Sequence, residues 1–341
     1  MSSNGSPQNS RETTTGAETD PENPMIADSP NNFSSPDDTT QSVDSTVWDF
    51  QEENGRTYHG YRAGSYLYPN DATEIERLDK QHAMLKYAFK GRNHFAPLSK
   101  PERILDLGTG TGIWAIEMSD EEFPSAEIHG TDLSPIQPEE MPENVHFFID
   151  DASEDNWLVQ PASIDYIHTR VLLGCFERPQ DVIRRAFYYT KPGGYVESQE
   201  ILTTPFCDDK TMPKDWPFIE WSNFLDQAST RANRPVRIAH KLKRWYEEAG
   251  FVDVQERIIR MPINPWMKDK HGKTLGRLNE ANILEGLGGW TMGPFSRMFQ
   301  WNKTEIEVYL VNVRKSISDR SVHAYLRVYV VWGRKPKKSK S

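Results

Sequence analysis

The chain has 341 residues and a formal net charge of −10, which allows one large or two ordinary domains. Its two cysteines, Cys175 and Cys207, are too few for a disulfide framework or a cysteine-based metal site, and they favour a reducing compartment. No apolar run approaches the roughly 18 residues of a membrane span, and the N-terminus lacks the apolar core of a signal peptide. We therefore expect a soluble, intracellular protein without a membrane span.

The N-terminal residues 1–47 form a predicted acidic tail. Residues 1–50 carry nine carboxylates and one basic residue, Arg11, so they hold −8 of the total charge of −10. Few large apolar side chains accompany these charges, and such a segment cannot bury enough surface to offset the entropy lost on ordering. We predict that the tail is disordered and that its acidity says nothing about the active site.

Residues 48–334 alternate predicted strands with predicted helices. Apolar residues at Ile75, Leu78 and Leu85 predict a helix over 72–89, which leads into a strand at 103–107. Strands separated by helices imply right-handed crossovers and a parallel, doubly wound sheet of the α/β class. The later strands are predicted in AEIHGTDLSP, VHFFIDDASEDNW, IDYIHTRVLL, KPGGYVESQEI, FVDVQERIIRMPI and HAYLRVYVVWGRKP, which makes seven in all.

Two helical insertions interrupt this alternation. One covers about 205–248 after the fifth strand, and the other covers about 268–318 after the sixth. Both lie on the carboxyl side of late strands, where ligands of such sheets bind, so we predict that they form a substrate lid. Their tryptophans either line a substrate cavity or belong to the core; these are Trp216, Trp221, Trp266 and Trp301.

A glycine-rich turn stands in ERILDLGTGTGIWAIEM, residues 102–118. Glycines at 108, 110 and 112 permit positive φ and let a ligand lie against the main chain, and the helix that follows offers unpaired N–H groups. A dinucleotide fingerprint needs a third glycine where this chain has Ile113, which disfavours a nicotinamide cofactor. The turn therefore predicts a site for another polar ligand.

The turn resembles the Asp-x-Gly-x-Gly-x-Gly turn of class I S-adenosylmethionine-dependent methyltransferases. The resemblance implies their seven-stranded Rossmann-like fold and S-adenosyl-L-methionine as cofactor. Asp132 stands where these enzymes place a carboxylate on the ribose hydroxyls, Asp151 and Ala152 stand where adenine is read, and KPGG stands at the usual start of the fifth strand. The implied cofactor-binding residues are Tyr58, Asp106, Gly108, Thr109, Gly110, Gly112, Asp132, Leu133, Asp151 and Ala152.

A narrower resemblance covers nearly all of residues 50–341. ENGRTYHGY, DLSPIQP, RPVRIAHKLKRWYEEAGF and GPFSRMFQW are similar to segments of the LaeA-like fungal methyltransferases. This resemblance implies a role in the control of fungal development and secondary metabolism, in the nucleus and cytoplasm. It also implies protein partners, either velvet-type regulators or another methyltransferase subunit, and we expect no direct binding of nucleic acid.

Few catalytic side chains are expected, because an activated methyl group mainly needs an aligned acceptor, exclusion of water and sometimes a base. His168 follows the fourth strand, where substrate-facing residues lie, and is either that base or a hydrogen-bonded structural histidine. Tyr58 either folds over the methionine end of the cofactor or anchors the N-terminal segment. We expect no metal, and both small molecules and protein side chains stay open as acceptors. On the fifth strand, Glu197 and Glu200 either face the pocket or cap the insertion.

Two functions remain open at this point. The chain is either an active methyltransferase or a cofactor-binding, weakly or non-catalytic regulatory subunit that works through protein partners. The glycines and the strand-end carboxylates favour cofactor binding in both cases. The basic C-terminal tail, 335–341 in RKPKKSKS, is either a solvated end or a nuclear-import patch.

Overall fold

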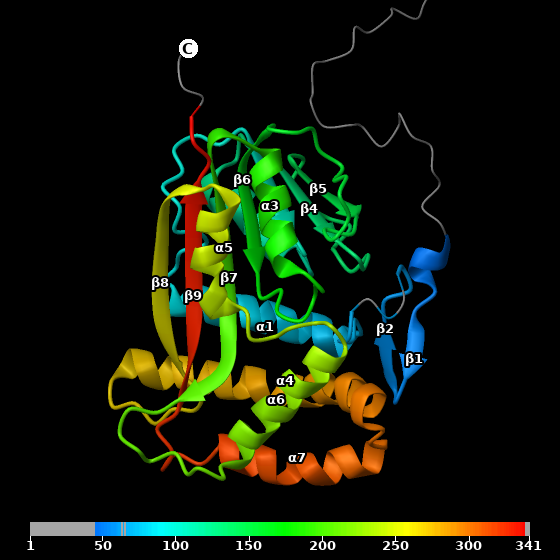
Figure 1. The fold of residues 1–341 in the computed structure, drawn as a ribbon, viewed down its shortest axis with the longest axis vertical. Helices are drawn as coiled ribbons and strands as arrows, with labels where there is room; N and C mark the ends of the chain where they lie inside the picture. The colour runs from blue at the N-terminus through cyan, green and yellow to red at the C-terminus, as the bar shows by residue number, and fades with distance from the viewer. Residues whose placement is uncertain (1–44, 63, 65, 338–341) are drawn as a thin grey trace, which may run out of the picture. The chain divides into compact units, whose positions relative to one another are not determined.

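The computed structural model describes residues 45–62, 64 and 66–337 (Figure 1). Most of the predicted tail 1–47 and the last four residues of the basic end lie outside this part. The strands are β1 (Gln51–Glu53), β2 (Arg56–Tyr58), β3 (Arg103–Leu107), β4 (Glu127–Asp132), β5 (Val145–Ile149), β6 (Ile164–Arg170), β7 (Thr190–Phe206), β8 (Val252–Pro262) and β9 (Tyr325–Arg334). The α-helices are α1 (Ala72–Ala88), α2 (Ile113–Glu117), α3 (Pro179–Tyr189), α4 (Pro217–Arg231), α5 (Leu242–Ala249), α6 (Lys270–Phe299) and α7 (Lys303–Ile317). Shorter turns of helix are η2 (Ser45–Trp48), η3 (Met118–Glu122) and η4 (Ala239–Lys241).

The main sheet has seven strands in the order β5-β4-β3-β6-β7-β9-β8. The first five are parallel, whereas β9 runs antiparallel to both β7 and β8. The predicted seven-stranded, doubly wound Rossmann-like sheet is thus confirmed, with one reversed strand near its edge. The KPGG segment lies inside β7 rather than before it, because Gly193 and Gly194 exchange backbone hydrogen bonds of 2.9 Å with Lys335.

The two faces of the sheet are covered by different helices because successive strand residues point to opposite sides. Ile104 and Ile128 pack with Trp114 of α2, whereas Leu105 and Ile167 pack with residues of α3 and α5 on the other face. Figure 1 shows α3 and α5 on the near face of the strands. The central strands β3 and β6 are therefore buried on both sides, whereas the edge strand β8 stays largely exposed.

The helices α4, α6 and α7 pack together beyond the carboxyl end of β7 (Figure 1). They come from the two insertions, and their apolar faces join one core with Leu225, Phe295 and Leu310 fully buried. Asp269 caps the start of α6 by accepting a 2.8 Å hydrogen bond from the N–H of Gly272. In the described residues, no helix is both long and apolar enough to cross a membrane. We call α4, α6 and α7 the helical cap.

Candidate functional site

The glycine turn after β3 depends on backbone conformations that other residues avoid. Gly108, Gly110 and Gly112 all have positive φ, of +66°, +58° and +78°. A side chain would also lack space at two of them, because a Cβ on Gly108 would collide with Leu172 and one on Gly112 with the ring of Phe147. The turn therefore exposes its main chain at the end of the strand.

Asp132, at the end of β4, is fixed against this turn. Its Oδ2 accepts a 2.8 Å hydrogen bond from the N–H of Gly110, and its Oδ1 accepts one of 3.0 Å from the N–H of Ser134. Burial raises the pKa of Asp132, while these N–H donors oppose the rise. Each carboxylate oxygen keeps a further lone pair, so the side chain is held ready to accept from two hydroxyl groups.

A cavity opens where the strands β3, β4 and β5 end. The cavity wall contains the exposed turn, Asp132 and the segment after β5. In that segment, burial raises the pKa of Asp150 to about 6. Asp151 is held by a 2.8 Å hydrogen bond from the N–H of Ser153 to its Oδ1. The residues of the predicted cofactor set that line the cavity are Gly108, Gly110, Asp132, Leu133, Asp151 and Ala152. Their hydrogen-bonding groups suit a polar ligand such as S-adenosylmethionine, and we call this space the cofactor cavity.

Four members of the predicted set do not line the cofactor cavity. Asp106 lies within β3 and contacts His168, the N–H of Thr109 closes the turn on the carbonyl of Thr131 at 2.9 Å, and Gly112 is the N-cap of α2. The fourth, Tyr58, packs against α6, with the guanidinium of Arg297 at 5.0 Å from its ring. The structure thus places Tyr58 as an anchor of the N-terminal segment and gives no support to a cofactor contact.

The geometry also gives no support to His168 as a general base. Its ring is fully buried and stacks on Trp114 with 3.7 Å between centroids, and its Nδ1 lies 2.8 Å from Oδ1 of Asp106. Burial lowers the pKa of His168, and the ring does not line the cofactor cavity. His168 is therefore a hydrogen-bonded core histidine, held two residues below the end of β6.

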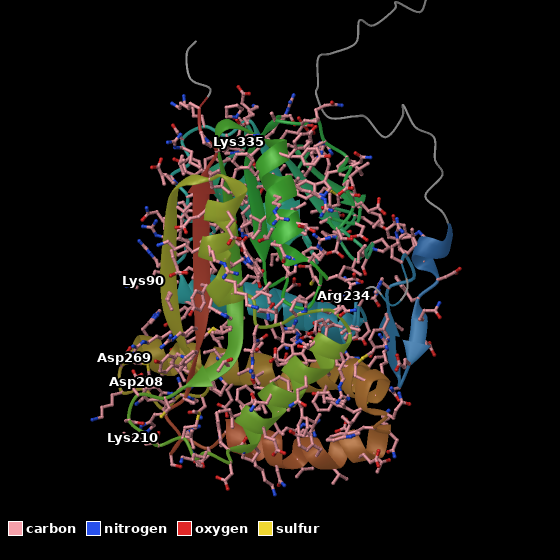
Figure 2. All side chains as sticks on the ribbon, in the orientation of Figure 1. Lys90, Asp208, Lys210, Arg234, Asp269 and Lys335 are labelled. Carbon is pink, nitrogen blue, oxygen red and sulfur yellow. The ribbon has the colours of Figure 1, made fainter. Side chains whose placement is uncertain are left out.

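Several cavity residues were not in the predicted set. Arg170, the last residue of β6, lines the cofactor cavity and donates a 2.7 Å hydrogen bond to Oε1 of Gln199. Burial lowers the pKa of Arg170 to about 10, so its guanidinium stays charged at neutral pH. Arg234, labelled in Figure 2, lies between α4 and η4 and donates a 2.8 Å hydrogen bond to the carbonyl of Cys175. The two arginines place positive charge beside the cofactor cavity.

A second pocket adjoins the cofactor cavity and extends under the helical cap. The two spaces share Tyr66, Leu78, Gln81 and Val171 as common walls. The far wall consists of side chains from α4 and α6, namely Phe218, Trp221, Leu225, Asn279, Asn282, Ile283 and Trp290. The pocket lies beside the cofactor cavity, on the side that a methyl acceptor has to reach, and we call it the acceptor pocket.

The charged groups of the acceptor pocket satisfy one another. Arg77 donates from Nη2 and Nε to the two oxygens of Glu74, at 2.6 and 2.9 Å, and from Nη1 to Oδ1 of Asn282 at 2.7 Å. Burial raises the pKa of Tyr66 and of Tyr68 above the ordinary tyrosine value, so both phenols stay protonated at neutral pH. Among the described residues that line this pocket, none is therefore a free carboxylate or an imidazole.

The two glutamates of β7 hold loops and line neither of these spaces. Glu197 accepts hydrogen bonds from the N–H groups of Phe95 and Ala96, at 2.8 and 2.7 Å. Glu200 accepts one from the N–H of Leu172 at 2.9 Å, while its Oε2 is buried without a hydrogen-bond partner among the described residues. Burial raises the pKa of Glu200 to about 8, so it is mainly protonated at neutral pH.

One cluster among the described residues has the chemistry of metal ligands. Glu127, His129 and His146 offer ligand atoms within 4.8 Å of one another. They belong to the first residues of β4 and β5, whereas the cofactor cavity lies at the opposite ends of these strands. The cluster is therefore separate from the methyl-transfer site, and the expected absence of a metal stays a prediction.

Comparison with known proteins agrees with this geometry. A family model described as a methyltransferase domain matches residues 80–256. The "Secondary metabolism regulator LAE1" of Cochliobolus heterostrophus is 39% identical over 83% of this chain and 94% of its own length. The "Methyltransferase pytC" of Aspergillus terreus is 35% identical over 88% of this chain and 92% of its own length.

A third relative carries a more specific name. The "Protein-methionine methyltransferase laeA" of Emericella nidulans is 35% identical over 84% of this chain and 77% of its own length. The family-model match over residues 80–256 contains the glycine turn, Asp132 and the helix α4. The chain belongs to the LaeA-like family of S-adenosylmethionine-dependent methyltransferases.

Proposed function

We propose that the chain transfers a methyl group to the thioether sulfur of a methionine side chain in a protein, and that this reaction regulates secondary metabolism and development. The observation that carries the proposal is the acceptor pocket, which is mainly apolar and whose described lining offers no free base. The relative in Emericella nidulans is named a protein-methionine methyltransferase, which supports the same acceptor class.

The absence of a base from the described lining of the acceptor pocket selects among nucleophiles. An alcohol, an amide or an ammonium group must lose a proton before or during methyl transfer, which requires a positioned base. A thioether has no such proton and is neutral before the reaction. Because both oxygens of Glu74 are held by Arg77 and the pKa of Tyr66 is raised by burial, the pocket suits the thioether best.

The aromatic walls suit both sides of this reaction. Trp221, Trp290 and Phe218 line the pocket, and aromatic rings make favourable contacts with the sulfur of methionine. The product is a sulfonium cation, which the faces of the same rings stabilise. The guanidinium of Arg77 already lies 5.0 Å from the ring of Trp290, so that ring accepts a cation in this fold.

The roles of the chain's residues follow from this assignment. The bound cofactor supplies an already activated methyl group. Asp132 and the exposed main chain of the glycine turn fix the cofactor, and Gln81 and Val171 form the boundary at which the two spaces meet. The helical cap excludes water and aligns the acceptor, so catalysis rests on positioning rather than on proton transfer.

A matched pair of peptides tests the acceptor class. We expect methyl-labelled S-adenosylmethionine and the purified chain to label a peptide with one central methionine, and to leave unlabelled the same peptide with norleucine, which lacks the sulfur. The labelled residue should carry a fixed positive charge that persists after all amines are blocked. Label on the norleucine peptide, or on a lysine, would refute the thioether assignment. No label on any peptide, with or without protein partners, would favour the non-catalytic regulatory subunit.

We also propose that the chain works in a regulatory complex, with velvet-type proteins or another methyltransferase subunit, in the nucleus and cytoplasm. Two of the relatives described above are named methyltransferases and one is named a secondary metabolism regulator. The basic end is the testable part. Lys335 is partly fixed, because its Nζ donates to the carbonyl of Tyr188 at 3.1 Å and lies 4.9 Å from the ring of Phe187.

Localisation is best tested without disturbing this contact. We expect the triple change of Lys337, Lys338 and Lys340 to Ala to move a fluorescently tagged protein toward the cytoplasm, while the triple change to Arg keeps it nuclear. Cofactor affinity should be the same in both. An unchanged nuclear signal in the alanine variant would show that the basic end is no import signal, and repeating the experiment in cells without the partner would show whether the partner carries the chain.

A further inference from the structure

A large groove lies along the outer edge of β8, apart from the methyl-transfer site. Its volume is about 720 Å³, and it shares no lining residue with the cofactor cavity or the acceptor pocket. The lining comes from the end of α1, the strand β8, the start of α6 and the segment after β7. In Figure 2, Lys90, Asp208 and Asp269 mark its surroundings on the β8 side of the sheet. We call it the β8 groove.

The groove follows an open edge of the sheet. The strand β8 is last in the sheet order and pairs with β9 on one side, so its other side has no partner strand in the described part of the chain. Four consecutive residues of β8, 257–260, line the groove, which means that it runs along the edge rather than over one face. Such an edge offers unpaired N–H and C=O groups to an added strand.

One end of the groove carries positive charge that nothing in the described residues neutralises. Lys90, Arg92 and Arg257 line it, and none of the three has an ion pair within that part of the structure. The guanidinium groups of Arg92 and Arg257 lie 5.9 and 5.1 Å from the ring of Phe95. Arg92 and Arg257 therefore lie beside an apolar floor that contains Phe95, Phe89 and Leu275.

The carboxylates of the groove, in contrast, have local partners. Asp208 accepts hydrogen bonds from Nη1 of Arg260 at 2.6 Å and from the hydroxyl of Tyr325 at 2.8 Å. Asp269 is the N-cap of α6, and Asp209 accepts from the hydroxyl of Thr211 at 2.8 Å and pairs with His323. In the view of Figure 2, Lys90 is labelled apart from Asp208 and Asp269, and the guanidinium groups of Arg92 and Arg257 both lie at the ring of Phe95.

We propose that the β8 groove binds an extended acidic segment of a partner protein. The segment adds to the edge of β8 as a further strand, its carboxylates pair with Lys90, Arg92 and Arg257, and its apolar side chains lie on Phe95 and Leu275. Main-chain hydrogen bonds give affinity in this mode of recognition, and the side chains on alternate positions give specificity. The proposal is independent of the acceptor chemistry, because the groove and the acceptor pocket have no residue in common.

The probe is a fluorescent ten-residue peptide of alternating glutamate and valine, titrated with the full chain and followed by anisotropy. We expect saturable binding that weakens as the salt concentration rises, because exposed ion pairs are screened. A lysine–valine peptide of the same length should not saturate. The glutamate–valine peptide N-methylated at alternate amides should bind at least about tenfold more weakly when the methyl groups face the strand edge. Equal binding of the N-methylated peptide would refute strand addition.

Charge-reversal variants test the location. We expect Arg92→Glu with Arg257→Glu to weaken binding of the probe at least about tenfold. The matched control reverses two exposed lysines that line none of these spaces, Lys243 and Lys315, and should stay within twofold. Unchanged melting temperature and cofactor affinity show that the variants are folded. Full affinity in the first variant, no saturable binding by the wild type, or a dimer that the probe does not dissociate would each overturn the proposal, the last in favour of a second copy on β8.

Discussion

The cofactor cavity and the acceptor pocket are adjacent, yet they are built in different ways. The glycine turn, Asp132 and Asp151 lie between residues 103 and 152, and this part of the cavity wall offers a ligand main chain and a fixed carboxylate. The acceptor pocket collects side chains from α1, α4, α6 and β9, which are far apart along the chain. We therefore expect the cofactor side to depend on local sequence, and the acceptor side to decide what is methylated.

Two carboxyl groups of the main sheet, at the end of β4 and within β7, repeat this contrast. Both oxygens of Asp132 accept from backbone N–H groups, and the side chain lines the cofactor cavity. Glu200 holds the loop after β6 through one oxygen, and its other oxygen is buried without a partner in the described structure. Asp132 is placed to bind a ligand, whereas Glu200 holds a loop in position. We therefore expect the two groups to respond differently to pH and to mutation.

The largest expected effect concerns Glu200 and the free energy of unfolding. Burial raises its pKa from 4.5 to about 8, so the folded state keeps a proton that the unfolded chain releases above about pH 4.5. The contribution of protonated Glu200 to the free energy of unfolding is fully present below pH 4.5 and is lost as the pH rises through 8. When the pH rises from about 5 to about 8, the free energy of unfolding of the wild type should fall by about 3 kcal/mol more than that of Glu200→Gln. The neutral amide of the variant can keep the contact with Leu172. Urea unfolding at both pH values measures this; equal losses would mean that folded Glu200 is ionised.

The next effect concerns the glycine turn. Gly112→Ala places a Cβ at a φ of +78° and against the ring of Phe147, which should cost about 2 to 3 kcal/mol in stability and cofactor binding together. Gly288→Ala is the matched control, because a Cβ there meets nothing within 4 Å. In a helix that change should stabilise by about 0.5 to 1 kcal/mol. Melting temperature and calorimetric affinity distinguish the two, and an unaffected Gly112→Ala protein would contradict the geometry of the turn.

Asp132→Ala should weaken cofactor binding by about 1 to 3 kcal/mol, because it leaves two backbone donors and the ribose hydroxyls without their acceptor. Asp253→Ala, which removes an exposed partner of Arg334, should leave the affinity unchanged. Isothermal titration with S-adenosylmethionine measures both. If a folded Asp132→Ala protein binds the cofactor normally, Asp132 is not part of its site.

The smallest effect separates the two sides of the site. Trp290→Ala should weaken transition-state stabilisation for the acceptor, measured from kcat/KM, by about 1 to 2 kcal/mol, because an aromatic wall of the acceptor pocket is lost. Trp290→Phe should recover part of the activity. The dissociation constant of the cofactor should change less than about twofold in both, because Trp290 does not line the cofactor cavity. A parallel rise in that constant would show that the two sides are not separable.

The cofactor side could be predicted because its signals are local. Glycines at alternate positions between a strand and a helix, followed by Asp132 at the next strand end, predict a ligand site without knowledge of the tertiary structure. The limit of such reasoning is visible in β6. His168 and Arg170 are two residues apart on one face of the strand, but only Arg170, at its end, lines the cofactor cavity. When the end of a strand is predicted two residues too early, a core histidine is therefore mistaken for a catalytic candidate.

The acceptor side could not be predicted in detail because its residues meet only after folding. Tyr66, Gln81 and Trp290 have no common motif, and the last is more than 200 residues from the first. The insertions were recognisable as helical from their apolar pattern, but the pattern does not say which helix face meets which partner. The same holds for the β8 groove, whose cations come from the end of α1 and from β8. Long-range packing, rather than local preference, decides these contacts.

The helix α6 belongs to both the β8 groove and the acceptor pocket. His271 and Leu275 line the groove, and Asn279 and Trp290 of the same helix line the pocket. Leu275 and Asn279 are one turn apart, about 6 Å along the axis. A helix that lines two binding sites offers a path for coupling between their binding free energies, and any such coupling is reciprocal. If a strand on β8 tightens the hold on the methyl acceptor tenfold, the acceptor must tighten the hold on that strand by the same factor.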